Sequence, residues 1–199
     1  MEKMRLVVGI SGATGAIYGV RLLEVLRMSP EIETHLVISE PGKRTIQHEL
    51  DMSVEEVGAL ADFVYDYFDV GAAISSGSFK TAGMVIAPCS IKTMSALANS
   101  YNDNLLVRAG DVTLKEGRPL VVVIRETPLH VGHLRLMTEL ANMGAVLLPP
   151  VPAFYTRPKT IDDIVNHTVG KILDRFGIGH NLFERWSGLR DKPPISHHA

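Results

Sequence analysis

The sequence lacks three features that would each point to a class of protein. It has a single cysteine, Cys89, which excludes an internal disulfide and favours a reducing compartment. No apolar run approaches the ~20 residues of a membrane-spanning helix, and the run at residues 6–10 is too short for a secretion signal. Basic residues are not in excess, since 20 Lys and Arg stand against 22 Asp and Glu. We therefore expect a cytoplasmic protein with no membrane span and no nucleic-acid partner.

Size and composition fit one folded domain. The chain has 199 residues, of which 46% are hydrophobic and 21% charged, close to the averages of globular proteins. Neither an internal repeat nor a linker divides it. We expect a single domain over residues 1–186 and a polar, proline-containing tail over 187–199 that is loosely held.

Short apolar runs rich in β-branched residues alternate with segments of helical periodicity. The predicted strands cover residues 4–10, 34–39, 83–88, 119–125 and 145–148. The predicted helices cover residues 15–28, 43–50, 53–62, 90–98, 105–116, 129–143 and 160–176. This alternation predicts an α/β fold in which helices cover both faces of a parallel sheet. In such folds ligands bind beyond the carboxyl ends of the strands, where the strand order reverses.

A glycine-rich loop lies between the first predicted strand and helix. It reads Gly9-Ile-Ser-Gly-Ala-Thr-Gly15. Free backbone amides and the helix dipole favour an anion at such a turn, and glycine permits close approach of a ligand. Ser11 stands where a dinucleotide fingerprint needs its second glycine, and no Walker lysine follows. A purely structural turn is the alternative interpretation.

Two later strand ends also carry polar groups. Ser90 is at a helix N-cap position and is followed by Lys92 and Thr93, a set that suits a phosphate or a flavin edge. The alternative is a simple cap beside a solvated lysine. Arg125 and Glu126 leave a very hydrophobic strand together, as phosphate binding and proton transfer require. The alternative is an ion pair that merely ends the strand.

Other segments are less specific. A stiff, proline-rich stretch over residues 149–155 ends in Phe154 and Tyr155, which either face a ligand or pack into the core. His130 and His133 are three residues apart, but no further ligand type lies nearby, so we predict no metal site. The residues alone predict an α/β enzyme that handles phosphorylated ligands.

Taken together, these motifs resemble the flavin prenyltransferases of the UbiX family, formerly described as phenylacrylic acid or hydroxybenzoate decarboxylases. The resemblance spans residues 4–186. Its markers are Gly9-x-Ser-Gly-Ala-Thr-Gly-Ala16, Ser75-Ser-Gly-Ser-Phe79, Pro88-Cys-Ser-x-Lys-Thr93, Ala109-x-Asp-Val-x-Leu-Lys-Glu116, Arg125-Glu-Thr-Pro128 and Gly144-Ala-x-x-x-Pro-Pro-x-Pro-Ala-Phe-Tyr155.

The resemblance implies a three-layer α/β/α, flavodoxin- or Rossmann-like subunit of a homododecamer with active sites between subunits. It implies transfer of the dimethylallyl group of dimethylallyl phosphate to N5 and C6 of reduced FMN, without a metal. The product, prenylated FMN, would serve a partner decarboxylase of the UbiD family, in ubiquinone synthesis or in aromatic-acid breakdown.

The resemblance also assigns roles by position. The positions that match FMN-binding residues are Gly12, Ala13, Thr14, Ser39, Ser90, Ile91, Lys92, Thr93 and Arg125. Glu49 matches a carboxylate near the flavin and is the candidate base. The positions that match groups around the dimethylallyl phosphate are Lys115, Glu126, Tyr155 and Lys171, with Arg108 and Trp186 in matching segments. Thr14 stands where many relatives have serine, and Lys171 where some have arginine.

Two other functions stay open from the sequence. An FMN-dependent cysteine decarboxylase of related fold would carry an Ala-Ser-Ala-Asn-Thr-like segment, where this chain has Pro88-Cys-Ser-Ile-Lys-Thr93. It would also use a histidine base on an early helix, for which this chain has no convincing equivalent. A non-enzymatic FMN-binding subunit of a decarboxylase complex would need no second phosphate site. The set of Lys115, Glu126 and Lys171 argues against that subunit.

Overall fold

The computed structural model describes residues 3–188, which form an alternating series of strands and helices. The strands are β1 (Met4–Ile10), β2 (Ile32–Ile38), β3 (Phe63–Tyr65), β4 (Gly83–Cys89), β5 (Leu120–Ile124) and β6 (Val146–Leu147). The helices are α1 (Ala16–Arg27), α2 (Glu40–Glu49), α3 (Val54–Gly58), α4 (Ile91–Ala98), α5 (Leu105–Lys115), α6 (Val131–Asn142) and α7 (Ile161–Arg175). Single 3-10 turns lie at Ala73–Ser75 and Phe154–Thr156.

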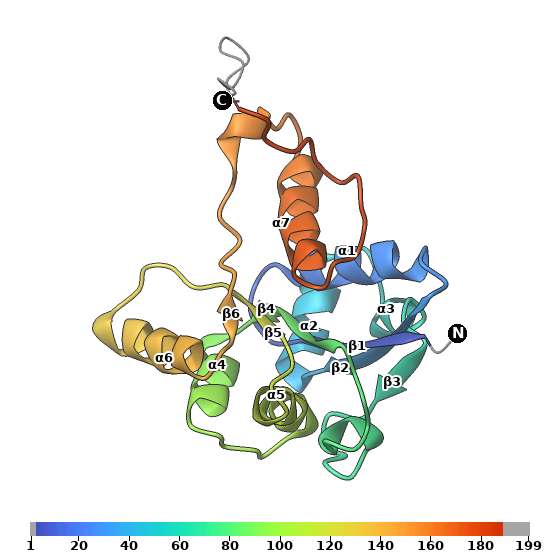
Figure 1. Ribbon diagram of the computed structural model, residues 1–199, viewed down its shortest axis with the longest axis vertical. Coiled ribbons are helices and arrows are strands. Elements are labelled where there is room, and N and C mark those ends of the chain that lie inside the picture. Colours follow the sequence, from blue (N-terminus) through green and yellow to red (C-terminus); the bar gives the residue numbers. More distant parts are fainter. Residues whose placement is uncertain (1–2, 189–199) are drawn as a thin grey trace, which may run out of the picture.

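The strands form one parallel sheet in the order β3-β2-β1-β4-β5-β6 (Figure 1). The chain passes from β1 through β2 to the edge strand β3, returns to the middle of the sheet at β4, and continues through β5 to the other edge at β6. The strand order therefore reverses between β1 and β4, as in Rossmann folds, and the crevice at that point is the expected ligand site. The prediction of a three-layer α/β/α fold is confirmed.

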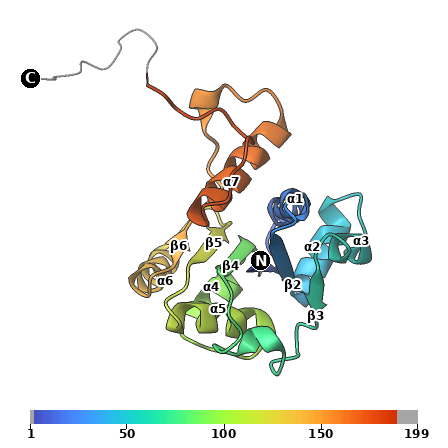
Figure 2. The same cartoon turned by 45° about the vertical axis from the view of Figure 1, so that its right-hand side comes forward.

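Two apolar layers hold the helices to the sheet. Successive side chains of a strand point to opposite faces, so Val8 faces α1 and α7 whereas Val7 faces α4 and α5. Both layers consist mainly of fully buried aliphatic side chains. Figure 2 shows α4, α5 and α6 on one side of the sheet and α1 with α7 on the other, and the N-terminal end of α7 projecting beyond the strands.

Some elements differ from the predicted ones. Strand β3 was not predicted because it has three residues and exposes Phe63 and Val64, so it shows no buried alternation. The helix predicted over residues 53–62 is the single turn α3, because the chain then extends into β3. The expected start of α7 is confirmed, since Thr160 and Asp163 form a capping box.

Two further predictions concern the chain ends and the membrane. Within residues 3–188 no helix has both the length and the apolar character needed to cross a bilayer. Most of the tail predicted over 187–199 lies outside the described residues, so the boundary at residue 186 stays a prediction.

Candidate active site

The loops that follow β1 and β4 are joined by one buried serine. The hydroxyl of Ser11 donates to the carbonyl oxygen of Pro88 at 2.9 Å and accepts from the amide of Ser90 at 2.7 Å. The Ser11 amide donates to the same carbonyl oxygen at 3.1 Å. These bonds cross the point where the strand order reverses, so the two polar loops form one edge of the site.

The glycine loop packs closely against the start of α2. A Cβ on Gly12 would lie 2.2 Å from Cβ of Pro41, so only glycine fits there. The Ala13 amide donates to the Ser11 carbonyl oxygen at 2.9 Å, whereas the Gly12 and Thr14 amides have no hydrogen-bond partner in the part of the chain described. Thr14 is exposed. The loop therefore offers two backbone donors and a hydroxyl to a ligand.

The first turn of α1 already holds an anion, the carboxylate of Glu49. Its Oε2 accepts hydrogen bonds from the amides of Gly15 at 2.8 Å and Ala16 at 3.1 Å. The glycine-rich motif predicts a ligand at this helix terminus. These two donors are instead taken by the end of α2, so a ligand of this loop has to use the amides before Gly15.

A cavity of about 480 Å³ opens beside the loop, at the carboxyl ends of β1 and β5. Its walls include Thr14, Tyr18, Arg125, Glu126, Pro149 and Ile164. The Arg125 side chain forms no hydrogen bond or ion pair with residues 3–188, so the alternative of an Arg125–Glu126 pair is not found. Burial raises the pKa of Tyr18, and the charge of Arg125 opposes this with a smaller lowering. A free guanidinium and a carboxylate thus share one cavity.

Ser39 and Ser90 cap the helices that begin at this edge. Oγ of Ser39 accepts from the Gly42 amide at 3.0 Å, and Oγ of Ser90 accepts from the Thr93 amide at 3.3 Å. The Ser90 hydroxyl donates to Oγ1 of Thr93 at 3.1 Å. The N-cap predicted at Ser90 is confirmed, and both serines lie beside the strand ends where an FMN site was expected.

The next residues of α4 lie at a separate hollow. Ile91 begins the helix and is half-buried, while Lys92 is exposed. Lys92 lines a cavity of about 430 Å³ together with Tyr67, Tyr101 and Asp103. Lys92 does not line the cavity that contains Arg125.

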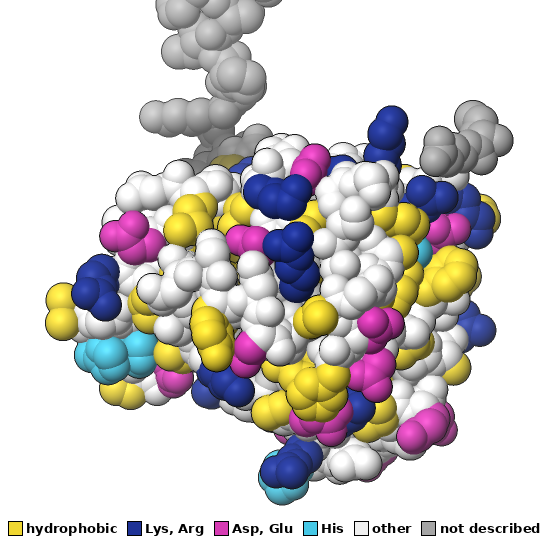
Figure 3. All heavy atoms as spheres, turned by 90° about the horizontal axis from the view of Figure 1, so that it is seen from below, with side chains coloured by type: hydrophobic (Ala, Val, Ile, Leu, Met, Phe, Trp, Pro, Cys, Tyr) yellow, Lys and Arg dark blue, Asp and Glu magenta, His cyan; other side chains and the backbone are white. Residues whose placement is uncertain are grey.

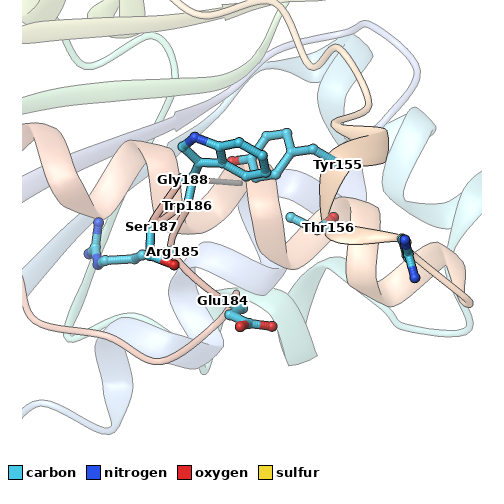
Figure 4. A pocket seen from close by; sticks show the side chains of 8 residues that line it. Tyr155, Thr156, Glu184, Arg185, Trp186, Ser187 and Gly188 are labelled. Atoms are coloured by element: carbon cyan, nitrogen blue, oxygen red, sulfur yellow. The ribbon is translucent and has the colours of Figure 1, made fainter. Parts of the chain in front are cut away.

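Tyr155 and Trp186 form a second group, beside α7, and Lys171 lies on that helix with its Nζ 3.9 Å from Oδ2 of Asp174. The hydroxyl of Tyr155 lies 3.0 Å from Nε2 of His167, and its ring meets the Trp186 indole edge to face at 5.6 Å (Figure 4). Both aromatic side chains line a cavity of about 400 Å³. His167 is not among the predicted site residues, although its spacing of four residues from Lys171 on a helix places the two side by side.

Lys115 and Arg108 lie apart from both groups. Lys115 ends α5 and pairs with Glu116, which lowers the pKa of that glutamate. Because α5 leads into the start of β5, Lys115 is at the amino edge of the sheet, and the five residues of β5 put Arg125 about 17 Å along the strand. Arg108 bonds the carbonyl oxygen of Ser75 and Asp111. One subunit therefore does not bring all the predicted site residues together.

The remaining candidates for metal binding or covalent chemistry are the histidine pair and the Cys89 thiol. In the part of the chain described, no three His, Cys, Asp or Glu side chains are arranged to hold a metal ion. The rings of His130 and His133 stack at 3.6 Å, and Nδ1 of His130 accepts from the Gly132 amide. Complete burial raises the pKa of the Cys89 thiol, so it stays protonated and unreactive.

Charge is mixed on the lower face of the molecule. Figure 3 shows acidic, basic and apolar side chains interspersed there, without separation by sign. Phosphate contacts along a nucleic acid need a continuous basic surface. This face does not provide one.

Comparisons with known proteins cover almost the whole chain. A family model described as Flavoprotein matches residues 1–173. Flavin prenyltransferase UbiX of Escherichia coli (strain K12) is 61% identical over 186 residues, which are 92% of this chain and 98% of that protein. The crystal structure of a dodecameric FMN-dependent UbiX-like decarboxylase from Escherichia coli O157:H7 matches with a TM-score of 0.91 at 52% identity, over 93% of this chain and 100% of that one.

A second crystal structure contains ligands. It is AnUbiX (PadA1) in complex with FMN and dimethylallyl pyrophosphate, with a TM-score of 0.93 and 46% identity over 95% of this chain and 100% of that one. The residues that the family model matches include the glycine loop and Arg125. The chain therefore belongs to the flavoprotein family and, within it, to the flavin prenyltransferases of the UbiX type.

Proposed function

We propose that this chain transfers the dimethylallyl group of dimethylallyl phosphate to N5 and C6 of reduced FMN. The observation that carries the proposal is the cavity of about 480 Å³ in which Arg125 and Glu126 face the glycine loop at the reversal of strand order. A flavin phosphate and a phosphorylated co-substrate both need cations and backbone donors at such an edge. Relatives named flavin prenyltransferase, at about 60% identity, support the same reaction.

The residues at the strand ends suit FMN. The unpartnered amides of Gly12 and Thr14 and the Thr14 hydroxyl are donors, and the hydroxyl of Ser39 keeps a proton to donate while its oxygen caps α2. Arg125 supplies the positive charge. When bound, reduced FMN supplies the nucleophilic ring atoms of the transfer. AnUbiX binds FMN on the same fold, in support of this assignment.

The remaining candidates act on the substrate. Breaking the allylic C–O bond leaves the electron pair on the phosphate, so the charges of Lys115 and Lys171 stabilise the departing group. Glu126 gives that group a proton. The rings of Tyr155 and Trp186 present π-faces to the allylic carbon as positive charge develops on it. The bond from N5 would form with release of the N5 proton. The bond from C6 would form only when a proton, which N5 can supply, is added to the remaining double bond of the allylic group. Glu49 would then remove the proton that C6 loses.

These residues need more than one copy of the chain. Arg125 and Glu126 lie at the carboxyl edge, Tyr155 beside α7 with Lys171 on that helix, and Lys115 at the amino edge. We infer that neighbouring subunits of a homo-oligomer, a dodecamer by analogy with the UbiX-like decarboxylase, complete each site. Exposed apolar side chains on α6, such as Val131 and Leu134, suit such contacts.

We also propose where the reaction takes place and what receives its product. The one thiol, Cys89, is buried and reduced, in keeping with a cytoplasmic enzyme. Prenylated FMN has no further chemistry to perform at this site. A decarboxylase of the UbiD type is the proposed recipient, and release of the prenylated flavin to such an enzyme would be seen as recovery of decarboxylation by its apo form.

Anaerobic incubation of the purified protein with reduced FMN and dimethylallyl phosphate tests the reaction. Mass spectrometry is expected to find the flavin with one added isoprenyl unit. A parallel arm with dimethylallyl pyrophosphate tests which leaving group is accepted, since AnUbiX was crystallised with that compound. No prenylated flavin in either arm would overturn the proposal, and turnover of cysteine-terminated peptides with oxidised FMN would favour the decarboxylase alternative instead.

A further inference from the structure

Asp174, at the C-terminal end of α7, is bound by two residues of the chain that follows the helix. Its Oδ1 and Oδ2 lie 2.6 and 3.1 Å from the two terminal nitrogens of Arg185, a bidentate arrangement. Nε2 of His180 lies 3.1 Å from Oδ1, and the His180 side chain is 2% exposed. These bonds lower the pKa of Asp174, through Arg185 first. We call Asp174, His180 and Arg185 the carboxylate clasp.

Packing supports the clasp along α7. A Cβ on Gly170 would lie 2.5 Å from Phe183 and 2.6 Å from His180, so the absent side chain lets the returning segment rest on the helix. The Phe183 ring lies 4.6 Å from that of His167, and the Arg185 guanidinium lies 5.6 Å from the Phe183 ring centroid. An exposed ion pair alone contributes little to stability, but the Asp174–Arg185 pair lies against this packed cluster of rings.

The clasp determines where Trp186 lies. Arg185 and Trp186 are neighbours, and Figure 4 shows their side chains pointing apart, the guanidinium away from the indole. With Arg185 held on Asp174, the indole lies against Tyr155. Tyr155 is held in turn by His167, at 3.0 Å from its hydroxyl. One wall of the cavity lined by Tyr155 and Trp186 thus depends on the carboxylate of Asp174 on α7.

We propose that Asp174 is a positioning residue, which through Arg185 holds Trp186 over Tyr155. The two rings then form the aromatic wall that receives the apolar allylic group of the substrate. The identity of that group rests on the proposed function. The placement of Trp186 does not, because it follows from the clasp itself. Asp174 touches neither substrate nor flavin in this role.

Trp186 is the only tryptophan of the chain, so its fluorescence reports the wall directly. In the full-length protein we expect Asp174→Asn to shift the emission to the red and to increase quenching by acrylamide. The KM for dimethylallyl phosphate should rise about tenfold, as for the loss of one charge-assisted contact, while the KM for reduced FMN changes less than about twofold. Asp162→Asn, in the first turn of α7, is the matched control and should change neither.

Arg185→Gln is the second variant, and it leaves the fold intact because the Arg185 side chain is 60% exposed. It should reproduce both effects, whereas Arg185→Lys should restore them in part. Unchanged Trp186 emission in Arg185→Gln, or altered emission with an unchanged KM, would overturn the proposal. Altered emission in a protein whose wild type transfers no prenyl group would instead overturn the proposed function and leave the clasp standing.

Discussion

Oε2 of Glu49 lies 2.8 Å from the amide of Gly15, across 34 residues of sequence. The end of α2 thereby caps α1, at the helix terminus beside the cavity that contains Arg125. A carboxylate at a helix N-terminus interacts favourably with the dipole. Glu49 therefore orders the glycine loop from behind, in addition to the role as base that we propose for it.

Substitutions of Glu49 separate these two roles. Glu49→Gln keeps an oxygen acceptor for Gly15, so the free energy of unfolding should fall by less than about 1 kcal/mol. Prenyl transfer should fall about 100-fold, because an amide cannot take a proton. Glu49→Ala also removes the acceptor and should cost about 1 kcal/mol more in denaturant unfolding. Full turnover by Glu49→Gln would remove the role as base.

Gly12→Ala should loosen the glycine loop. The new methyl group meets Pro41 at 2.2 Å, so the loop or the start of α2 has to move. We expect a loss of about 1–3 kcal/mol in unfolding free energy, together with weaker FMN binding in a fluorescence titration. Gly179→Ala is the control, since nothing lies within 4 Å of its Cβ. Equal FMN affinity in both variants would contradict a close approach of the flavin to this loop.

Mixed oligomers test whether Lys115 acts in a neighbour's site. Arg125→Ala and Lys115→Ala should each be nearly inactive alone. Co-expressed in equal amounts, they should regain roughly a quarter of the activity. In random assembly, half of the sites receive an intact Arg125 and half of those also receive an intact Lys115 from the neighbouring subunit. If both residues of a site came from one subunit, no mixed oligomer would contain an intact site. Activity that stays at the level of the single variants would therefore contradict a shared site.

A buried polar cluster at the β2–β3 edge makes stability depend on pH. His35 is 2% exposed, with Nδ1 at 2.9 Å from the Tyr65 hydroxyl and Nε2 at 3.0 Å from Glu33, which also pairs with Arg5. Burial lowers the pKa of His35, opposed in part by Glu33, with Arg5 adding to the lowering and Asp62 opposing it. The unfolded chain then binds a proton more readily than the folded one, so this stability is present above about pH 6.5 and is lost as the pH falls.

Urea unfolding at about pH 7.5 and about pH 5.5 measures this effect. Wild type should lose stability on acidification, with His35 contributing at most about 1.4 kcal/mol per pH unit. His35→Gln keeps hydrogen-bonding groups without titrating and should show a smaller loss. His48→Gln, at an exposed position of α2, should behave like wild type. The same pH dependence in His35→Gln as in wild type would exclude His35 as its source.

Local signals account for the elements that were predicted well. The helix starts at Ser90 and Thr160 are short-range caps within four residues, and both are found. The apolar runs of β1 and β4 are long enough to be recognised as buried strands. Strand β3 has no such signal, because Phe63 and Val64 are exposed and the strand is defined by its pairing with β2.

The sequence by itself determined the alternation of strands and helices, the polar strand ends and, through its motifs, the family. These properties depend on residues that are close together in the chain. Only the tertiary structure decided that Glu49 caps α1, that Arg125 stands free in a cavity with Glu126, and that Asp174 binds Arg185. It also separated Lys115 from Arg125, because α5 runs opposite to the strands. Such relationships depend on the order and direction of whole elements, which no local pattern of residues encodes.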